Sequence, residues 1–320
     1  MKKITALLLT VILAIGMLSA CGSGKDGEKE PASAAAVTSE AAGTSEAAGT
    51  SEAAGSSAAA ENGNTDAESD WAYIQEKGIL VLGITLFAPM NYYEGTDTEN
   101  LIGFDTELAK AVGEKLGIAV DFVEINWDSK EVELNSKNID GIWNGMCITE
   151  ERKQNMSMTD PYLYNTQAIV MKADREAEIM ADVSGLTCVA EQGSTGEGKI
   201  LGTIEDDDTV EVSPSEYFKD VNYIAVDSMA KALMEVKAGT ADLAVIDSVA
   251  ASGMLTTESD YQDLVINLDN NFGLQEYGIA FRKGSDVTAM VNNAINELYQ
   301  EGVVAEIAAK YELTDMLVKR

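Results

Sequence analysis

Short apolar runs alternate with amphipathic helical patterns over most of this chain, and this alternation limits the folds open to it. Residues 78–84, GILVLGI, form an apolar run of strand length, and residues 104–116 place apolar side chains at helical spacing. Residues 118–124 predict a second strand. A strand, a helix and a strand in succession predict a β-α-β unit with parallel strands and the helix on one face of the sheet.

The same alternation continues toward the C-terminus. Further strands are predicted over residues 139–143, where Asn144-Gly145 ends the strand, and over 167–172, 186–191, 209–212 and 241–246. Helices are predicted over residues 127–136, from Thr149 onward, and over 195–201, 228–238 and 287–311, the last interrupted at Gly302. Two successive α/β series predict an α/β protein with two lobes, each a mixed sheet flanked by helices.

The N-terminal segment predicts export. Lys2-Lys3 precedes an apolar run over residues 4–17, and Leu18-Ser19-Ala20 leads to Cys21. This pattern resembles a bacterial lipoprotein signal peptide, residues 1–21, with cleavage before Cys21 and attachment of fatty acyl groups such as palmitate to that cysteine. A plain secretory signal and an uncleaved anchor are the alternatives. We expect an extracytoplasmic protein that is lipid-anchored to the cell membrane.

Residues 22–70 have the composition of a disordered tether. They contain three tandem copies of TSEAAG over residues 38–55 and few large apolar side chains. Such a segment cannot bury enough apolar surface to offset the entropy of ordering it. The folded part is therefore expected over residues 71–320, which is enough chain for two lobes.

Composition excludes several function classes. The chain has 54 acidic and 22 basic residues, a net charge of −32, and phosphate backbones would be repelled, so we expect no nucleic-acid partner. It has no histidine, the commonest general base and the commonest nitrogen ligand of zinc. Cys147 and Cys188 lack C-x-x-C spacing, and we expect no disulfide between them, since it would lock two lobes together. No metal or cofactor is predicted.

Residues 140–152, DGIWNGMCITEER, predict an anion site. Thr149 is placed to cap a helix, whose N-terminal N–H groups and dipole attract anions. Arg152, in the first turn, adds a planar guanidinium that can hold a carboxylate through two hydrogen bonds. Taken alone, the segment also fits an ordinary capped surface helix.

Five motifs in order resemble one family. They are LIGFDTELAKAVGEKLGI (101–118), the anion-site segment (140–152), DPYLYNTQAIV (160–170), AGTADLAVID (238–247) and EYGIAFRKG (276–284). Together they resemble the polar amino-acid substrate-binding lipoproteins of ABC importers, family 3 of the extracellular solute-binding proteins. The resemblance covers residues 79–311.

The resemblance implies the periplasmic-binding-protein type 2 fold. Its first lobe would comprise residues 71–168 and 268–320, its second residues 169–267, with crossover strands near residues 164–172 and 267–273 as the hinge. It implies a monomer without cofactor or catalytic activity. That monomer would bind a free polar L-amino acid between the lobes and deliver it to a membrane permease with its ATPase.

The family's carboxylate site falls on the segment already identified. By resemblance, Arg152 holds the α-carboxylate with help from backbone N–H groups around Gly145 and Cys147. Cys147 departs from the family, which has Ser or Thr there, and a thiol donates weakly. Ser194 and Thr195, at a helix start, would add contacts from the second lobe when the lobes close.

The remaining ligand contacts also follow from the resemblance. Asp247, after a strand, matches the acid that receives the α-ammonium, although it could instead cap the next helix. Phe87 and Trp127 match aromatic positions that flank the ligand side chain, although either could be plain core. Glu191 matches the position that senses the far end of that side chain. A carboxylate there favours arginine, lysine or ornithine over glutamine or cystine, whereas Ile84 lacks the acid that some binders of basic amino acids carry.

The sequence also contains features typical of other protein classes. GSTGEGK, residues 193–199, has phosphate-loop spacing, but Ile200 replaces the hydroxyl residue that binds magnesium. Residues 206–208, all Asp, lack the spacing of a calcium loop. An exported lyase or dehydratase on the same fold could use Glu191, Cys147 and Lys199 for acid–base work. A lipoprotein that senses the ligand for a receptor is the third alternative.

Overall fold

The computed structural model describes residues 69–320 except residues 97, 205–212, 258 and 270–271. The predicted signal peptide with Cys21 lies outside the described residues, as does all but the end of the predicted tether. The strand predicted over residues 209–212 and the acidic run over residues 206–208 lie outside them too.

The first sheet is mixed and holds the N-terminal β-α-β unit. Its strands, in spatial order, are β2 (Ala119–Glu124), β1 (Ile79–Ile84), β3 (Gly141–Cys147), β11 (Gln275–Arg282) and β4 (Met156–Met158), with β5 (Leu163–Asn165) also paired to β11. Strands β2, β1 and β3 are parallel, and β11 is antiparallel to β3, β4 and β5.

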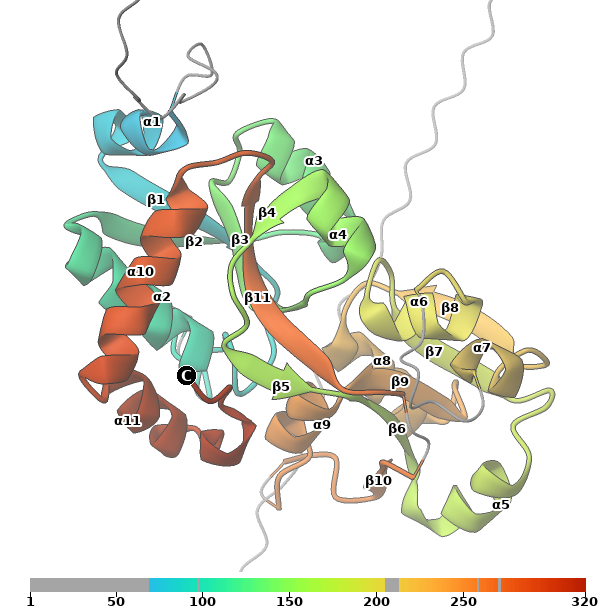
Figure 1. Ribbon diagram of the computed structural model, residues 1–320. Helices are drawn as coiled ribbons and strands as arrows, with labels where there is room; N and C mark the ends of the chain where they lie inside the picture. The colour runs from blue at the N-terminus through green and yellow to red at the C-terminus, as the bar shows by residue number, and fades with distance from the viewer. Residues whose placement is uncertain (1–68, 97, 205–212, 258, 270–271) are drawn as a thin grey trace, which may run out of the picture. The chain divides into compact units, whose positions relative to one another are not determined.

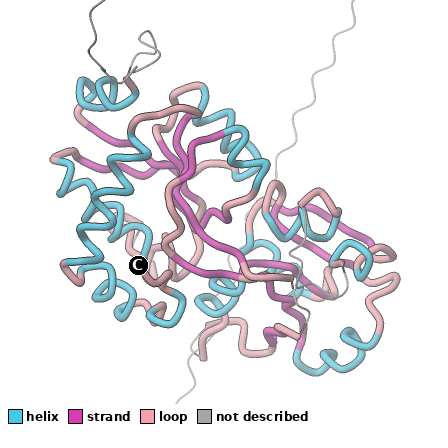
Figure 2. Tube along the Cα trace, in the orientation of Figure 1, coloured by secondary structure: helices cyan, strands magenta, loops and turns pink. Residues whose placement is uncertain are grey.

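The second sheet is also mixed. Its spatial order is β10 (Leu264–Asn267), β6 (Gln167–Lys172), β9 (Leu243–Asp247), β7 (Thr187–Glu191) and β8 (Asn222–Val226). Strands β9, β7 and β8 are parallel, whereas β10 and β6 run antiparallel to their neighbours. The chain passes from the first sheet to the second between β5 and β6 and returns between β10 and β11, and Figure 2 shows both sheets with helices around them.

Helices cover both sheets. Against the first sheet lie α1 (Asp70–Lys77), α2 (Phe104–Leu116), α3 (Lys130–Asn135), α4 (Glu150–Asn155) and α10 (Val287–Gln300), and α11 (Val303–Lys310) packs on α2 and α10. With the second sheet lie α5 (Glu176–Ala181), α6 (Thr195–Leu201), α7 (Pro214–Tyr217), α8 (Met229–Ala238) and α9 (Ser248–Met254). Short 3-10 turns are η1 (Trp127–Ser129), η2 (Ala173–Arg175) and η3 (Thr314–Met316).

Local sequence accounts for the helix ends. Ser194 and Ser228 cap α6 and α8 by accepting hydrogen bonds from backbone N–H groups of the first turn. Gly117 ends α2 in the left-handed conformation, which costs glycine little because it has no Cβ. These caps explain why α2 and α6 have the predicted bounds.

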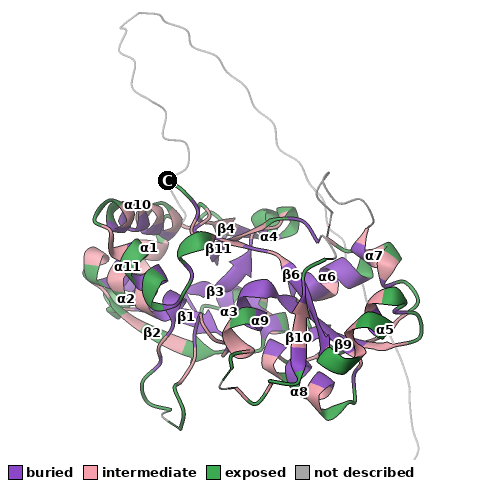
Figure 3. Cartoon of the chain, turned by 90° about the horizontal axis from the view of Figure 1, so that it is seen from below, coloured by how far each residue is buried: buried purple, intermediate pink, exposed green. Residues whose placement is uncertain are grey.

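The apolar core joins the two sheets. One continuous cluster of buried side chains runs from Leu82 and Phe104 in the first sheet and its helices, through Tyr277 on β11, to Val170 and Ile246 in the second sheet. Figure 3 shows the central strands β3 and β6 as largely buried, whereas the edge strands β2 and β8 are mostly exposed or half-buried. The two sheets therefore share one continuous apolar core.

One predicted boundary is wrong. Asn144-Gly145 does not end a strand, because β3 continues to Cys147 and pairs with β11 at Met146 and Cys147. The register shifts between Gly278 and Ala280, so the ladder absorbs the irregular backbone at Gly145, whose φ is +54°. Tertiary pairing overrode the local turn signal here.

Candidate functional site

A small cavity lies between the two sheets, where the parallel strands of each sheet end. Its free volume is about 10 Å³. The residues that the sequence predicted for the ligand site all line it: Phe87, Trp127, Gly145, Cys147, Arg152, Glu191, Ser194, Thr195 and Asp247. Thr85, Asn144 and Met229 complete the lining and were not predicted. Ligand crevices in α/β sheets form at such carboxyl ends of strands, which explains why residues far apart in sequence meet here.

Arg152 reaches from the first sheet to the second. The Thr149 hydroxyl accepts the Arg152 backbone N–H at 3.2 Å, which confirms Thr149 as the cap of α4. The guanidinium is buried, and Nη1 donates to the Cys147 carbonyl at 2.8 Å and to the Thr195 hydroxyl at 3.4 Å. Nη2 donates to the Gly193 carbonyl at 3.2 Å. The guanidinium is therefore held between α4 and the start of α6.

The Gly145 backbone N–H is already engaged. It donates to Asp105 Oδ2 at 2.7 Å, so it is not free to join the carboxylate site as predicted. Asp105, in the first turn of α2, also accepts from the Tyr162 hydroxyl at 2.8 Å, and burial raises its pKa to about 7. A Cβ at position 145 would approach Phe87 and Tyr277 to 3.0 and 3.1 Å, so glycine is needed here.

Cys147 is a neutral thiol in this site. It donates to Gln275 Oε1 at 3.3 Å, and burial, followed by the nearby Asp247 carboxylate, raises its pKa to about 12. Cys147 and Cys188 are both free and buried.

Asp247 lies at the end of β9 with no capping role. It occupies the N-cap position of α9, yet its side chain accepts no backbone hydrogen bond there. The Tyr277 hydroxyl donates to Oδ2 at 2.8 Å, and Gln167 Nε2 donates to Oδ1. Burial raises the pKa of Asp247, while these two donors and the charge of Arg152 act in the opposite direction.

Ser194 and Thr195 have different roles at the start of α6. The Ser194 hydroxyl accepts the Glu197 N–H at 3.1 Å and so caps the helix. The Thr195 hydroxyl faces the Arg152 guanidinium across the cavity.

Glu191 lines the cavity with one carboxyl oxygen that has no hydrogen-bond partner among the described residues. The residue is buried, and the unpartnered oxygen is Oε1. Burial, followed by the charge of Asp247, raises the pKa of Glu191 to about 8. An unpartnered buried carboxyl oxygen is costly, so this position is suited to a donor from a ligand.

Lys130 was missed by the sequence analysis. It is buried beside the cavity, where Nζ donates to the carbonyls of Gly193 and Trp127 at 3.0 and 3.1 Å. Nζ also lies 5.1 Å from the centre of the Trp127 ring. Burial, followed by the charge of Arg152, lowers the pKa of Lys130 to about 8. A lysine at the start of a short helix gave no signal of this contact.

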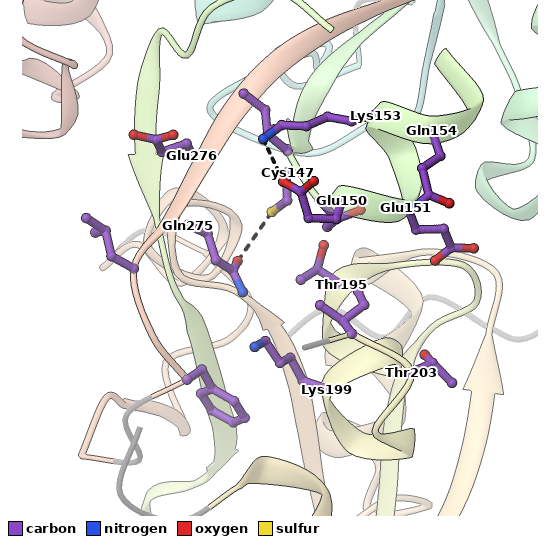
Figure 4. A pocket seen from close by; sticks show the side chains of 15 residues that line it. Cys147, Glu150, Glu151, Lys153, Gln154, Thr195, Lys199, Thr203, Gln275 and Glu276 are labelled. Atoms are coloured by element: carbon purple, nitrogen blue, oxygen red, sulfur yellow. Dashed lines mark hydrogen bonds and ion pairs between the residues drawn. The ribbon is translucent and has the colours of Figure 1, made fainter. Parts of the chain in front are cut away.

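A larger pocket lies beyond Cys147 and Thr195, which line both hollows. It has a volume of about 650 Å³ and is bordered by α4, α6 and the start of β11. Figure 4 shows Gln275 among the residues that line this larger pocket, with its amide oxygen toward Cys147. The larger pocket lacks Arg152, Glu191 and Asp247, which line the smaller cavity, and has its own charged residues, namely Glu150, Glu151, Lys153, Lys199 and Glu276.

Within the described parts of residues 69–320, no group of His, Cys, Asp and Glu side chains could hold a metal ion. In the same residues, no helix is both long enough and apolar enough to cross a membrane.

The chain belongs to the bacterial extracellular solute-binding proteins, family 3, whose model matches residues 80–314. The family resemblance drawn from the motifs is thus confirmed. The chain is 30% identical to the arginine-binding extracellular protein ArtP of Bacillus subtilis over 72% of this chain and 85% of ArtP. It is 29% identical to the L-cystine-binding protein TcyA of the same organism over 97% of each chain.

Solved structures confirm the periplasmic-binding-protein type 2 fold. A histidine-bound substrate-binding protein of an ABC uptake transporter from Streptococcus pneumoniae matches with a TM-score of 0.68 and 28% identity, over 78% of this chain and 99% of that one. An ancestral amino-acid-binding protein, a precursor of cyclohexadienyl dehydratase, matches with a TM-score of 0.63 and 26% identity, over 76% and 99%.

Proposed function

We propose that this protein binds a free L-amino acid in the cavity between the two sheets and delivers it, chemically unchanged, to an ABC permease with its ATPase. Arg152 would hold the α-carboxylate and Asp247 the α-ammonium. The observation that carries the proposal is that these two opposite charges are both buried and line one cavity. Buried charges are costly without partners, and a zwitterion offers a partner to each.

The ligand side chain is proposed to be cationic. Glu191 places an unpartnered buried carboxyl oxygen in the cavity, and a guanidinium or ammonium would supply both a donor and a charge. Arginine, lysine and ornithine are therefore favoured over glutamine and cystine. The arginine-binding relative supports this choice, while the cystine-binding relative and Ile84 at the end of β1 weigh against it.

Binding would require the two sheets to move apart. A free volume of about 10 Å³ is the space of roughly one water molecule and cannot admit an amino acid. The contacts that must open include the hydrogen bonds of Arg152 to Thr195 and Gly193, the bond of Lys130 to Gly193, and the bond from Gln192 to Asp128. Differential contact of the ligand with the closed form would then drive closure.

Two variants test the proposal. Fluorimetry of thermal unfolding with the twenty amino acids, ornithine and cystine should first show selective stabilisation by one class. In calorimetry, Arg152→Ala should abolish binding of the selected amino acid. Asp247→Asn should weaken binding of that amino acid far more than binding of its deaminated analogue. Equal losses for both ligands, or normal binding by the Arg152 variant, would contradict the assigned roles.

An enzyme on the same frame is the second candidate, because one structural relative is a precursor of a dehydratase. Incubation with the selected amino acid separates the two functions. Stoichiometric, reversible binding with the ligand recovered intact supports transport, whereas a steady appearance of product supports an enzyme. A ligand sensor would differ from a transporter only in its protein partner, and reconstitution with the permease distinguishes those two.

A lipid anchor at the N-terminus and a division of the folded part into two lobes complete the proposed function. Cys21 would carry the lipid, residues 22–70 would tether the folded part outside the cell, and the protein would act as a monomer. The first lobe would comprise residues 71–168 and 268–320, and the second residues 169–267. Labelling cells with a radioactive fatty acid tests the anchor, because Cys21→Ala should lose the label.

A further inference from the structure

Tyr277 contacts both Gly145 and Asp247, two residues that line the proposed binding site. It lies on β11 in the first sheet, opposite Cys147 on β3 and Leu163 on β5. Its side chain is fully buried and belongs to the core that joins the sheets. Strand pairing on both sides fixes the backbone, so the direction of the ring is set by the sheet.

The ring of Tyr277 packs against Gly145, which lines the cavity. An added Cβ at Gly145 would meet the ring at 3.1 Å, so the two residues are packed together. The neighbouring Tyr162 ring has its centre 6.4 Å from that of Tyr277, and its hydroxyl donates to Asp105, which holds the Gly145 N–H.

The hydroxyl of Tyr277 reaches the ammonium end. It donates to Asp247 Oδ2 at 2.8 Å, and Asp247 belongs to β9 of the second sheet. The bond therefore crosses from one sheet to the other. Gln167 fixes the other oxygen of Asp247 and also donates to Gln275 Oε1 at 2.9 Å. Both carboxyl oxygens of Asp247 are thus directed by neutral donors.

We propose that Tyr277 is a positioning residue that holds Asp247 at the distance and angle from Arg152 that an α-amino acid requires. This inference rests on the proposed function and assigns no contact between Tyr277 and the ligand. The hydroxyl acts on the ammonium end alone, because the ring would keep the packing at Gly145 without it.

Tyr277→Phe tests the proposal, since it removes the hydroxyl and keeps the ring. With L-arginine as probe, calorimetry should show affinity weakened roughly 10- to 100-fold, the range for a hydrogen bond to a charged group. With 5-guanidinopentanoate, which lacks the α-ammonium, the affinity should be the same as that of the wild type. Equal losses for both probes would overturn the proposal, because a merely structural role would weaken them alike.

A second measurement needs no ligand. Loss of a donor to the charged form should raise the pKa of Asp247 further, measured by NMR titration of protein labelled with ¹³C at the aspartate carboxyl carbons, with Asp247→Asn to assign the signal. The ionisable groups that face Asp247 are Arg152, Cys147, Glu191 and Tyr277 itself, and only Tyr277 changes. An unchanged pKa would contradict the inference even if L-arginine proved not to be a ligand.

Tyr299→Phe is the matched control. Its hydroxyl donates to the Tyr162 carbonyl at 3.0 Å, away from Asp247, so the same atom is lost from the same half of the fold. It should leave the affinity for both probes and the Asp247 titration unchanged. If the Tyr299 variant shifted the ratio of the two affinities as much as the Tyr277 variant, the specific role would be refuted. Failure of Arg152→Ala or Asp247→Asn would instead refute the proposed function.

Discussion

At the scale of single residues, the pKa of Glu191 predicts how the affinity for a cationic ligand depends on pH. This pKa is raised to about 8, so at neutral pH Glu191 carries a proton that a cationic ligand must displace before the ion pair forms. The affinity for L-arginine should therefore rise at least roughly tenfold from pH 6 to pH 8 and then level off. Calorimetry across this range, in buffers of different protonation enthalpy, would also count the released proton.

Glu191→Gln is the control for that prediction, because the amide keeps the shape and cannot titrate. It should flatten the pH dependence and lower the affinity for L-arginine at pH 8. Lys130 titrates in the same range, so a slope retained in the Gln variant would assign the effect to Lys130. A neutral ligand such as L-glutamine should show little slope with the wild-type protein.

Sequence reasoning found the charged residues of the cavity but not their supports. Arg152, Glu191 and Asp247 follow strand ends or open helices, and the family motifs carry them. Tyr277 acts through Asp247, 30 residues away along the chain, and Lys130 contacts Gly193, 63 residues away. Contacts of Tyr277 depend on how β11 pairs, which no local pattern specifies.

At the scale of elements, the start of α2 depends on Gly103. Its φ is +125°, and an added Cβ would lie 2.1 Å from the Met90 carbonyl oxygen. Gly103→Ala should lower the free energy of unfolding by about 2–4 kcal/mol, because backbone must move. Gly117→Ala, at the other end of α2, meets open space at φ +67° and should cost only about 1 kcal/mol. Chemical denaturation measures both, and equal losses would contradict the steric argument.

The bounds of helices and strands with clear caps or apolar patterns in the sequence could be predicted accurately, whereas the bounds of elements without such patterns could not. The periodic helices α2 and α6 have the bounds that their caps indicate, and β6 matches its apolar run. The strand break at Asn144-Gly145 failed because pairing with β11 supplies hydrogen bonds that a turn signal does not consider. Short strands such as β4 and β8 carry too little apolar pattern to be recognised alone.

At the scale of the whole molecule, ligand exchange should depend on separation of the two sheets. Gln192 Nε2 on the second-sheet side donates to Asp128 Oδ2 on the first-sheet side at 3.1 Å. The double variant Asp128→Cys with Gln192→Cys should form a disulfide on oxidation, because the two backbones are close: an added Cβ at the adjacent Gly193 would lie 3.1 Å from Asp128 Cα. Stopped-flow fluorescence should then show no binding of the selected amino acid until dithiothreitol is added.

The buried native thiols do not compete with that crosslink, and each single cysteine variant serves as a control. Unchanged binding rates in the oxidised double variant, with the disulfide verified by mass, would show that ligands enter without separation of the sheets. The division into two α/β series was predictable from the order of strands and helices, whereas the contacts between them were not, because no repeated pattern in the sequence encodes them.

The Gly193 carbonyl oxygen competes with the ligand carboxylate for the Arg152 guanidinium. It accepts hydrogen bonds from both Arg152 and Lys130, so the guanidinium is already satisfied by an oxygen of the chain itself. Capture of a carboxylate is then an exchange of one oxygen acceptor for another, and the net free energy is the small difference between two similar sets of bonds. A shift of the Gly193 peptide group would therefore change the affinity for the ligand without any substitution of Arg152.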